Sequence, residues 1–395
     1  MKAPSAAITS VVMAGSIMAH PGLKNTLHEI EARLEPRQST SLIGDLQNLP
    51  ESNLTPTGSA VKQILTGEKN GQDLWSRYRS VPARDSPECS QDTCCIWKHI
   101  ADEMRASMVG TAGRCNKLAR GAVRLGFHDA GAWSQRTGPT GGADGSVVLA
   151  GECEDRKENQ GLESTCDQMR TWYDKYKQYG ISMADLIQMG ATVGTVVCPL
   201  GPRVRTFIGR KDNPDAAPTG NLPSPFASAD DIITMFADKT ISAQGLVALL
   251  GAHTASQQSH VYANQTGAPQ DTTPGVWDTT YFRETMADHC PKRMVRFVSD
   301  TNLAADERTR RFFSMYGGWL TGQHAWNEAY AREYVRLSLL GVDNINDLTE
   351  CTKALPPFMG STFYSPDEAK MARFMDGELD YAAEPLMMGD VIPDE

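Results

Sequence analysis

Apolar residues recur every three or four positions along most of the chain, and this spacing predicts a mostly α-helical protein. Strand-like alternation is scarce, and residues 203–208 give the best short case. Ser182 and Ser242 stand where N-caps are expected, and Gly341 stands where a helix should stop. The predicted helices cover residues 96–109, 114–127, 168–178, 182–196, 228–239, 242–254, 279–288, 301–316 and 322–340.

The stretches between and beyond these helices indicate how the chain is organised. Long loops rich in Gly, Pro and Asp, at residues 136–165, 209–227 and 261–278, are of a length that is commonly functional or held by something. A lysine followed by a short apolar stretch opens the chain and is typical of a cleaved secretory signal, although a buried N-terminal helix is the alternative. The predicted segments are a signal peptide at 1–19, a leader, propeptide or loose extension at 20–88, the compact domain at 89–360 and a poorly patterned tail at 361–395.

Charge and cysteine content narrow the function classes. The 395 residues carry a formal net charge of −10 and no basic block, which argues against nucleic acid or an anionic membrane as a partner. No run after the first residues approaches the ~20 apolar positions of a membrane span, so a soluble mature protein is expected. The 9 cysteines contain no CxxC pair, which favours disulfides in an oxidising compartment over a zinc site. Asn53 and Asn264 begin glycosylation tripeptides, consistent with secretion.

The first candidate chemistry lies in VRLGFHDAGAW, residues 123–133. Arg124 and His128 are one helical turn apart and share a face, which suits proton transfer beside a permanent positive charge. A surface arginine next to a core histidine is the alternative. Asp129 and the GGADGS motif at 141–146 supply oxygen donors at short intervals, so they predict either a Ca²⁺ cage or an ordinary solvated turn.

A second histidine repeats this pattern. His253 shares an apolar stripe with three leucines of the predicted helix 242–254, a position that is commonly a core position. Thr254 follows it directly, and DTTPGVWD at 271–278 again spaces oxygen donors closely. Two units that each combine a helical histidine with an oxygen cluster favour a functional site more strongly than either unit does alone.

In this order the motifs resemble those of the secreted fungal (class II) haem peroxidases of the plant-type peroxidase superfamily. Further matches are NQGL at 159–162, CPLGPRVRTFIGRKD at 198–212, LLGAHT at 249–254 and VSD at 298–300, so the resemblance covers roughly residues 89–360. It implies a mostly α-helical, two-lobed fold with haem b between the lobes. It also implies an enzyme that reduces hydrogen peroxide and oxidises small phenolic or dye-like donors by one-electron steps, in lignin or aromatic degradation.

The resemblance assigns the distal residues. His128 would be the distal base, Arg124 its charged partner and Asn159 the residue that orients His128. Phe127 would pack above the haem plane. Of the two Ca²⁺ ions that the family implies, the distal one would be held by Asp129, Gly142, Asp144 and Ser146.

The proximal residues follow in the same way. His253 would ligate the haem iron, and Asp300 would accept the other ring N–H, which raises the basicity of the ligand. The proximal Ca²⁺ would be held by Thr254, Asp271, Thr273, the Val276 carbonyl and Asp278. The disulfides expected by resemblance are Cys89–Cys95, Cys94–Cys351 and Cys115–Cys198, with Cys153 and Cys166 able to pair locally and Cys290 left over.

Three departures from the relatives shape the expected substrate. Lys117, Gly121 and Ser259 stand where manganese-oxidising members carry carboxylates, so that cation site is not expected. Ala248 stands where lignin- and versatile-type members carry a surface tryptophan. Gln270 replaces an aromatic residue next to the proximal imidazole, which leaves the tuning of the iron open.

A generic peroxidase is therefore expected, a monomer whose partners are hydrogen peroxide and small aromatic donors. One hypothesis is that a surface aromatic residue serves as a radical relay for electrons. A non-catalytic haem- or calcium-binding protein that kept the fold is the main alternative, and a metal-dependent hydrolase is a distant one. The relay candidates are Trp133, Trp172 and Tyr173.

Overall fold

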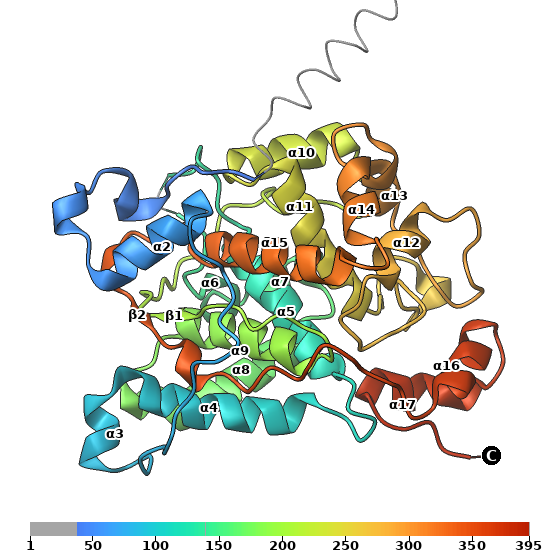
Figure 1. Ribbon diagram of the computed structural model, residues 1–395, viewed down its shortest axis with the longest axis horizontal. Coiled ribbons are helices and arrows are strands. Elements are labelled where there is room, and N and C mark those ends of the chain that lie inside the picture. The colour runs from blue at the N-terminus through green and yellow to red at the C-terminus, as the bar shows by residue number, and fades with distance from the viewer. Residues whose placement is uncertain (1–37, 139, 395) are drawn as a thin grey trace, which may run out of the picture. The chain divides into compact units, whose positions relative to one another are not determined.

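Helices form most of the structure, as the periodicity predicted (Figure 1). The computed structural model describes residues 38–138 and 140–394, so the predicted signal segment at 1–19 lies outside the described residues. The strands β1 (Phe207–Ile208) and β2 (Thr349–Glu350) pair antiparallel, and β1 falls inside the one predicted strand. The α-helices of the described residues are α2 (Pro56–Thr66), α3 (Pro87–Gln91), α4 (Thr93–Met108), α5 (Lys117–Ala130), α6 (Ser146–Leu149), α7 (Glu152–Asp155), α8 (Glu163–Tyr176), α9 (Met183–Val197), α10 (Ala229–Asp238), α11 (Ala243–Leu250), α12 (Thr280–Met286), α13 (Val298–Ala305), α14 (Arg310–Tyr316), α15 (Gly322–Leu337), α16 (Glu368–Met375) and α17 (Ala383–Met388).

Figure 1 shows α15 crossing between two groups of helices. Helices α4, α5, α8 and α9 lie on one side of it, and α10 to α14 lie on the other. A single hydrophobic core runs through both groups. On α15, Trp326 stacks on Trp277 at 5.1 Å between ring centroids, and Tyr330 meets Trp277 edge-on at 4.7 Å. This arrangement is the mostly helical, two-lobed fold that the resemblance implied.

The helix α5 is fixed by close packing against α9. A Cβ at Gly194 of α9 would lie 2.6 Å from a backbone oxygen of α5, so only glycine allows this approach. The Asn116 side chain caps α5 by accepting from the amides of residues 118 and 119. The disulfide Cys115–Cys198 joins the start of α5 to the end of α9. The side chains that α5 projects toward the interior therefore stand on a rigid backbone.

The predicted helix boundaries hold at the caps and fail at two breaks. Ser182 and Ser242 accept from backbone amides of their helices, as predicted. The predicted helix 242–254 divides into α11 and a 3₁₀ helix, Gly251–Ala255. The predicted helix 301–316 divides into α13 and α14, because the Asp306 carboxylate accepts from the Arg308 amide and turns the chain.

Residues 38–88 differ from the loose extension that the sequence predicted. Ile64 and Leu65 of α2 are fully buried and belong to the main core. Arg336 of α15, itself fully buried, donates to the backbone oxygen of Ser39 at 2.8 Å. The described part of this segment is thus packed against the helical domain.

The chain after residue 360 also departs from the expected tail. It forms α16 and α17, which share a small second core with the segment around residue 294. Arg114 and Asp367 anchor it through two hydrogen-bonded contacts of 2.5 and 2.9 Å, and both side chains are almost fully buried. Burial alone would raise the pKa of Asp367, but the hydrogen bonds from Arg114, Ile392 and Ser365 lower it to about 2.

No single helix in residues 38–138 and 140–394 is long and apolar enough to cross a membrane. Two neighbouring helix pairs reach that length and composition together, but they are bent by 120° and 105° at the joint.

Substituting Asp367 tests whether the last helices contribute to stability. We expect Asp367→Ala to lower the free energy of unfolding by about 3–5 kcal/mol, because Arg114 stays buried without its partner. Urea denaturation of the full chain measures this. The control is Asp394→Ala, since this exposed carboxylate pairs only with Lys370 and should change stability little. An equal loss in both variants would contradict the assigned anchor.

The same pair has a defined pH dependence. The folded pKa of Asp367, about 2, lies below the ordinary value of 3.8, so the stabilisation is complete above about pH 4 and is lost as the pH falls toward 2. The difference in unfolding free energy between the native chain and Asp367→Ala should shrink over that interval.

Candidate active site

A pocket of about 960 Å³ lies between α5 and the segment that joins α11 to residue 261. Its walls include the apolar stripe of α11, Leu246, Leu249 and Leu250, which the sequence alone would assign to the core. Both candidate histidines, His128 and His253, line it. The pocket also has many polar and charged residues in its lining, so it combines apolar walls with groups that can orient a bound molecule.

His128 is held in one tautomer by Asn159. The Asn159 amide donates from Nδ2 to the Glu152 carbonyl at 2.9 Å, so its Oδ1 faces His128 Nδ1 at 2.7 Å. Nδ1 must then carry the proton, and Nε2 is the unprotonated nitrogen, able only to accept. Burial, followed by the charge of Arg124, lowers the pKa of His128 to about 3. The ring is therefore a neutral base at ordinary pH.

Arg124 is the hydrogen-bond partner of that unprotonated nitrogen. Its Nε donates to His128 Nε2 at 3.2 Å. Its two terminal nitrogens donate to the backbone oxygens of Glu158 and Gln160 at 2.9 and 3.0 Å. The guanidinium is thus fixed by the loop that also carries Asn159, and its positive charge faces the same pocket as the base.

His253 is also held through its Nδ1, in this case by a carboxylate. Its Nδ1 lies 2.9 Å from Oδ2 of Asp300, which is fully buried on α13. Nδ1 therefore donates, and Nε2 is the nitrogen that remains for a metal ion. Tyr281 and Phe297 meet the imidazole edge-on at 5.7 and 5.8 Å and fix its plane.

Oxygen atoms gather next to His128, where the sequence predicted a cage. Asp129 Oδ2 accepts from the Gly145 amide, but Oδ1 is buried and has no hydrogen-bond partner. The Ser146 hydroxyl is also buried and unpartnered. Burial, and then the charge of Asp144, raises the pKa of Asp129 well above its usual range. A buried carboxylate beside another, with an open oxygen, fits a bound cation.

A second cluster lies next to His253. The Thr254 hydroxyl donates to the Asp271 carboxylate and to the Val276 carbonyl. Thr273 donates its amide to the other Asp271 oxygen at 3.0 Å. Burial and then the charge of Asp278 raise the pKa of Asp271 well above its usual range. The sequence-predicted donors of this cluster are therefore brought together, again with more negative charge than the protein neutralises.

The pocket thus holds two partly buried imidazoles, of which His253 is backed by a carboxylate and His128 is hydrogen-bonded to an arginine. Comparison with known proteins shows the class of protein. A family model described as "Peroxidase" matches residues 100–318. "Manganese peroxidase 3" of Phlebia radiata is 27% identical over 312 residues, covering 73% of this chain and 84% of that protein. "Ligninase C" of Trametes versicolor is 30% identical over 290 residues, covering 67% and 75%. "Peroxidase" of Arthromyces ramosus is 28% identical over 299 residues, covering 70% and 80%.

The chain therefore belongs to the peroxidase family, and it is a haem peroxidase of the fungal class II type. It reduces hydrogen peroxide and takes electrons from aromatic donors. Membership of the family implies haem and calcium as cofactors. The expected disulfides are present, including the local pair, as Cys89–Cys95, Cys94–Cys351, Cys115–Cys198 and Cys153–Cys166, and Cys290 is free.

The positions that depart from the relatives have structural consequences. A Cβ at Gly121 would lie 2.2 Å from the Thr165 hydroxyl, so no side chain fits there without a shift. Ala248 is fully buried, which rules it out as a surface electron relay. Trp172 is only 1% exposed, so the prediction that it is a surface aromatic is wrong. Trp133 is half-buried against the core.

Sequence reasoning missed residues that hold Asp300 and Gln270 in place through direct hydrogen bonds. Tyr281 donates to Asp300 at 2.9 Å, and Ser299 donates to its other oxygen at 3.0 Å. Ser256 fixes the amide of Gln270. Nothing in the local sequence signals Tyr281, because α12 meets α13 only in the folded chain.

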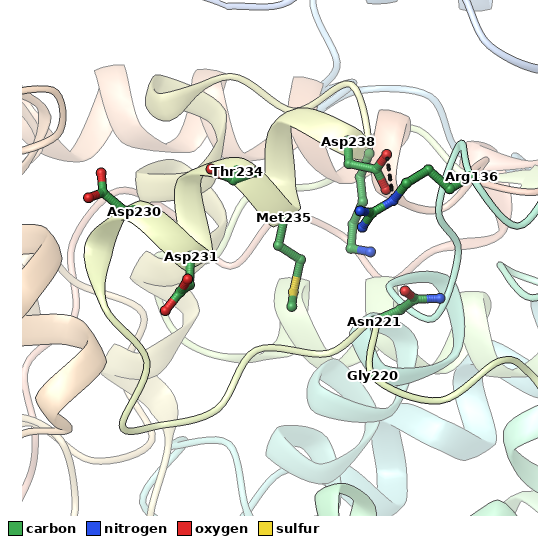
Figure 2. Close-up of a pocket in the computed structure, with 9 residues that line it drawn as sticks. Arg136, Gly220, Asn221, Asp230, Asp231, Thr234, Met235 and Asp238 are labelled. Carbon is green, nitrogen blue, oxygen red and sulfur yellow. Dashed lines mark ion pairs between the residues drawn. The ribbon is translucent and has the colours of Figure 1, made fainter.

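A second, smaller pocket of about 280 Å³ lies against α10 (Figure 2). Arg136 and Asp238 form an ion pair at 3.5 Å, and Asp230 and Asp231 lie away from that pair. Asp230 is paired with Arg308, and Asp231 accepts from a neighbouring serine. The carboxylates of this pocket thus have partners, and it takes no part in the chemistry of the two histidines.

Proposed function

We propose that His253 binds the iron of haem b through Nε2 and that His128 and Arg124 activate hydrogen peroxide in the same pocket. The observation that carries this is the hydrogen bonding of His128, whose Nδ1–H is donated to Asn159 while Nε2 is unprotonated and accepts from Arg124 Nε. Phe127, which lines the pocket and lies edge-on to His128 at 5.8 Å, supports the distal wall.

Haem, when bound, supplies the two-electron reduction of peroxide and the two one-electron oxidations of the donor. The chain moves the protons. His128 Nε2 accepts the proton of one peroxide oxygen and returns it to the other, which leaves as water. Arg124 stabilises the negative charge that develops as the O–O bond breaks. Each turnover converts one peroxide and two donor hydrogens into two waters and two donor radicals.

We propose small aromatic compounds as the donors. Phe226 lies at the pocket with more than half of its surface exposed, and Leu222, Pro223 and Pro225 surround it. Apolar side chains of this kind fit an aromatic ring. Lys117 and Ser259 are exposed and carry no negative charge, which argues against Mn²⁺ as the donor.

We propose two Ca²⁺ ions, one in each oxygen cluster. The distal ion would take Asp129, Gly142, Asp144 and Ser146, and the proximal ion would take Thr254, Asp271, Thr273, Val276 and Asp278. The buried, unpartnered oxygens of Asp129 and Ser146 support the distal site. Each ion would sit one residue after a catalytic or ligating histidine and would fix the end of its helix.

We further propose that the protein acts outside the cell as a monomer, after removal of residues 1–19. Its four disulfides suit an oxidising compartment, and both glycosylation acceptors, Asn53 and Asn264, are exposed.

Replacing the proposed base tests the mechanism. We expect His128→Leu to slow the reaction with peroxide by about 10²–10⁴-fold while haem stays bound, because proton transfer is lost and His253 is intact. Stopped-flow absorption of the holoenzyme measures the rate, and the Soret band reports haem. The exposed His324→Leu is the control and should react normally. A normal rate in His128→Leu would refute the assigned role.

A donor comparison tests the substrate class. We expect the holoenzyme to oxidise small phenols in steady state and to give no saturable oxidation of Mn²⁺ under the same conditions. Phe226→Ala should raise the KM for a phenol, since it removes an apolar side chain of the pocket. Saturable Mn²⁺ oxidation in the native chain would contradict this proposal.

Calcium removal tests the two clusters. We expect atomic emission to find two calcium ions per chain, and one in Asp129→Asn or Asp271→Asn. The control, Asp174→Asn, alters an exposed carboxylate paired with Lys177 and should retain both. Restoring calcium to 100 times the Kd should stabilise each site by about 2.7 kcal/mol, seen as a rise in Tm. Full stability and activity after complete calcium removal would argue against the clusters as calcium sites.

A further inference from the structure

The Asp300 carboxylate accepts more hydrogen bonds than the proximal histidine alone requires. Oδ2 accepts from His253 Nδ1, from Gln270 Nε2 and from the Tyr281 hydroxyl, each at 2.9 Å. Oδ1 accepts from the Ser299 hydroxyl at 3.0 Å. A carboxylate oxygen offers about two lone-pair directions, so three donors on Oδ2 compete for the same charge.

The orientation of Gln270 follows from its neighbours. Its Nε2 faces the Asp300 carboxylate, which can only accept, and lies 3.3 Å from His253 Nδ1. Its Oε1 faces the Ser256 hydroxyl, which donates to it. The reversed amide would place oxygen against carboxylate. Gln270 is 2% exposed, so water does not replace this contact.

The Tyr281 side chain is also fixed in place, by burial and by ring packing. The ring is 1% exposed and packs edge-on against Phe282 at 5.5 Å between centroids. Its hydroxyl reaches Asp300 of α13 from α12. Two neutral donors from different elements therefore converge on the one oxygen that also holds His253.

We propose that Gln270 and Tyr281 are positioning residues that weaken the pull of Asp300 on the His253 N–H and so set how strongly His253 donates to iron. This inference rests on the proposed function, in which His253 is the iron ligand. A carboxylate with full charge draws the ring proton and makes the imidazole a stronger, more anionic donor. Charge taken up by two further donors is not available to His253, so the ligand is more neutral and the ferrous state is favoured.

The test uses the holoenzyme, with Tyr281→Phe, Gln270→Leu and the double variant. Resonance Raman spectroscopy of the ferrous protein measures the iron–histidine stretching band, and spectroelectrochemistry measures the ferric/ferrous midpoint potential. We expect each single variant to shift the band to higher frequency and the potential to a more negative value. The double variant should shift both further than either single variant.

Tyr316→Phe is the matched control. Tyr316 is a fully buried tyrosine of the same aromatic cluster, 5.4 Å from Phe282, but its hydroxyl does not reach Asp300. It should leave the band and the potential unchanged. A band and potential that match the native values in both Tyr281→Phe and Gln270→Leu would overturn the proposal and leave the proposed function intact. A native holoenzyme without any iron–histidine band would overturn the proposed function, and this inference with it.

Discussion

The active site depends on how the negative charge of two carboxylates, each buried beside a histidine, is stabilised. Asp129 follows His128 directly, and Asp300 backs His253; both carboxylates are almost wholly inaccessible to water. A buried negative charge is costly unless it is hydrogen-bonded or paired with a cation. Asp300 meets this requirement with protein donors alone. Asp129 keeps a buried oxygen that no protein group satisfies. We propose that Asp300 acts on an iron ligand and that Asp129 binds a cation.

Each histidine lies near the end of a helical segment, directly before a residue of an oxygen cluster. His128 lies in the last turn of α5, and His253 lies in the 3₁₀ helix that continues α11. Helix ends fray unless their groups are held, and the residue after each histidine belongs to an oxygen cluster. The start of α5 is held separately by the disulfide Cys115–Cys198. Rigid placement of the two rings therefore arises from restraints just beyond them in the sequence.

The sequence predicted what depends on short spacing and missed what depends on distant contacts. Arg124 and His128 could be paired from the helical period alone, and the resemblance supplied the cysteine pairs that the structure contains. The period could not show that α2 packs against α15, because an eleven-residue amphipathic helix gives no sign of its partner. The same limit applies to Tyr281, whose partner Asp300 lies on another helix. Gln270 was noticed as a departure, but its role needed the position of that carboxylate.

Two positions that depart from the relatives, Ala248 and Gly121, are both closely packed in the folded chain. Ala248 lies under Trp326, whose indole donates to its carbonyl at 2.8 Å, so a tryptophan at 248 would need a different core. Gly121 faces Thr165 too closely to carry a carboxylate. Both positions are therefore in close packing contact with residues of other helices. What remains adjustable is the polar contact beside His253, where Gln270 and the Tyr281 hydroxyl both donate to Asp300. Because these hydrogen bonds go to Asp300, which holds His253, we propose that they act on His253 without contacting His128.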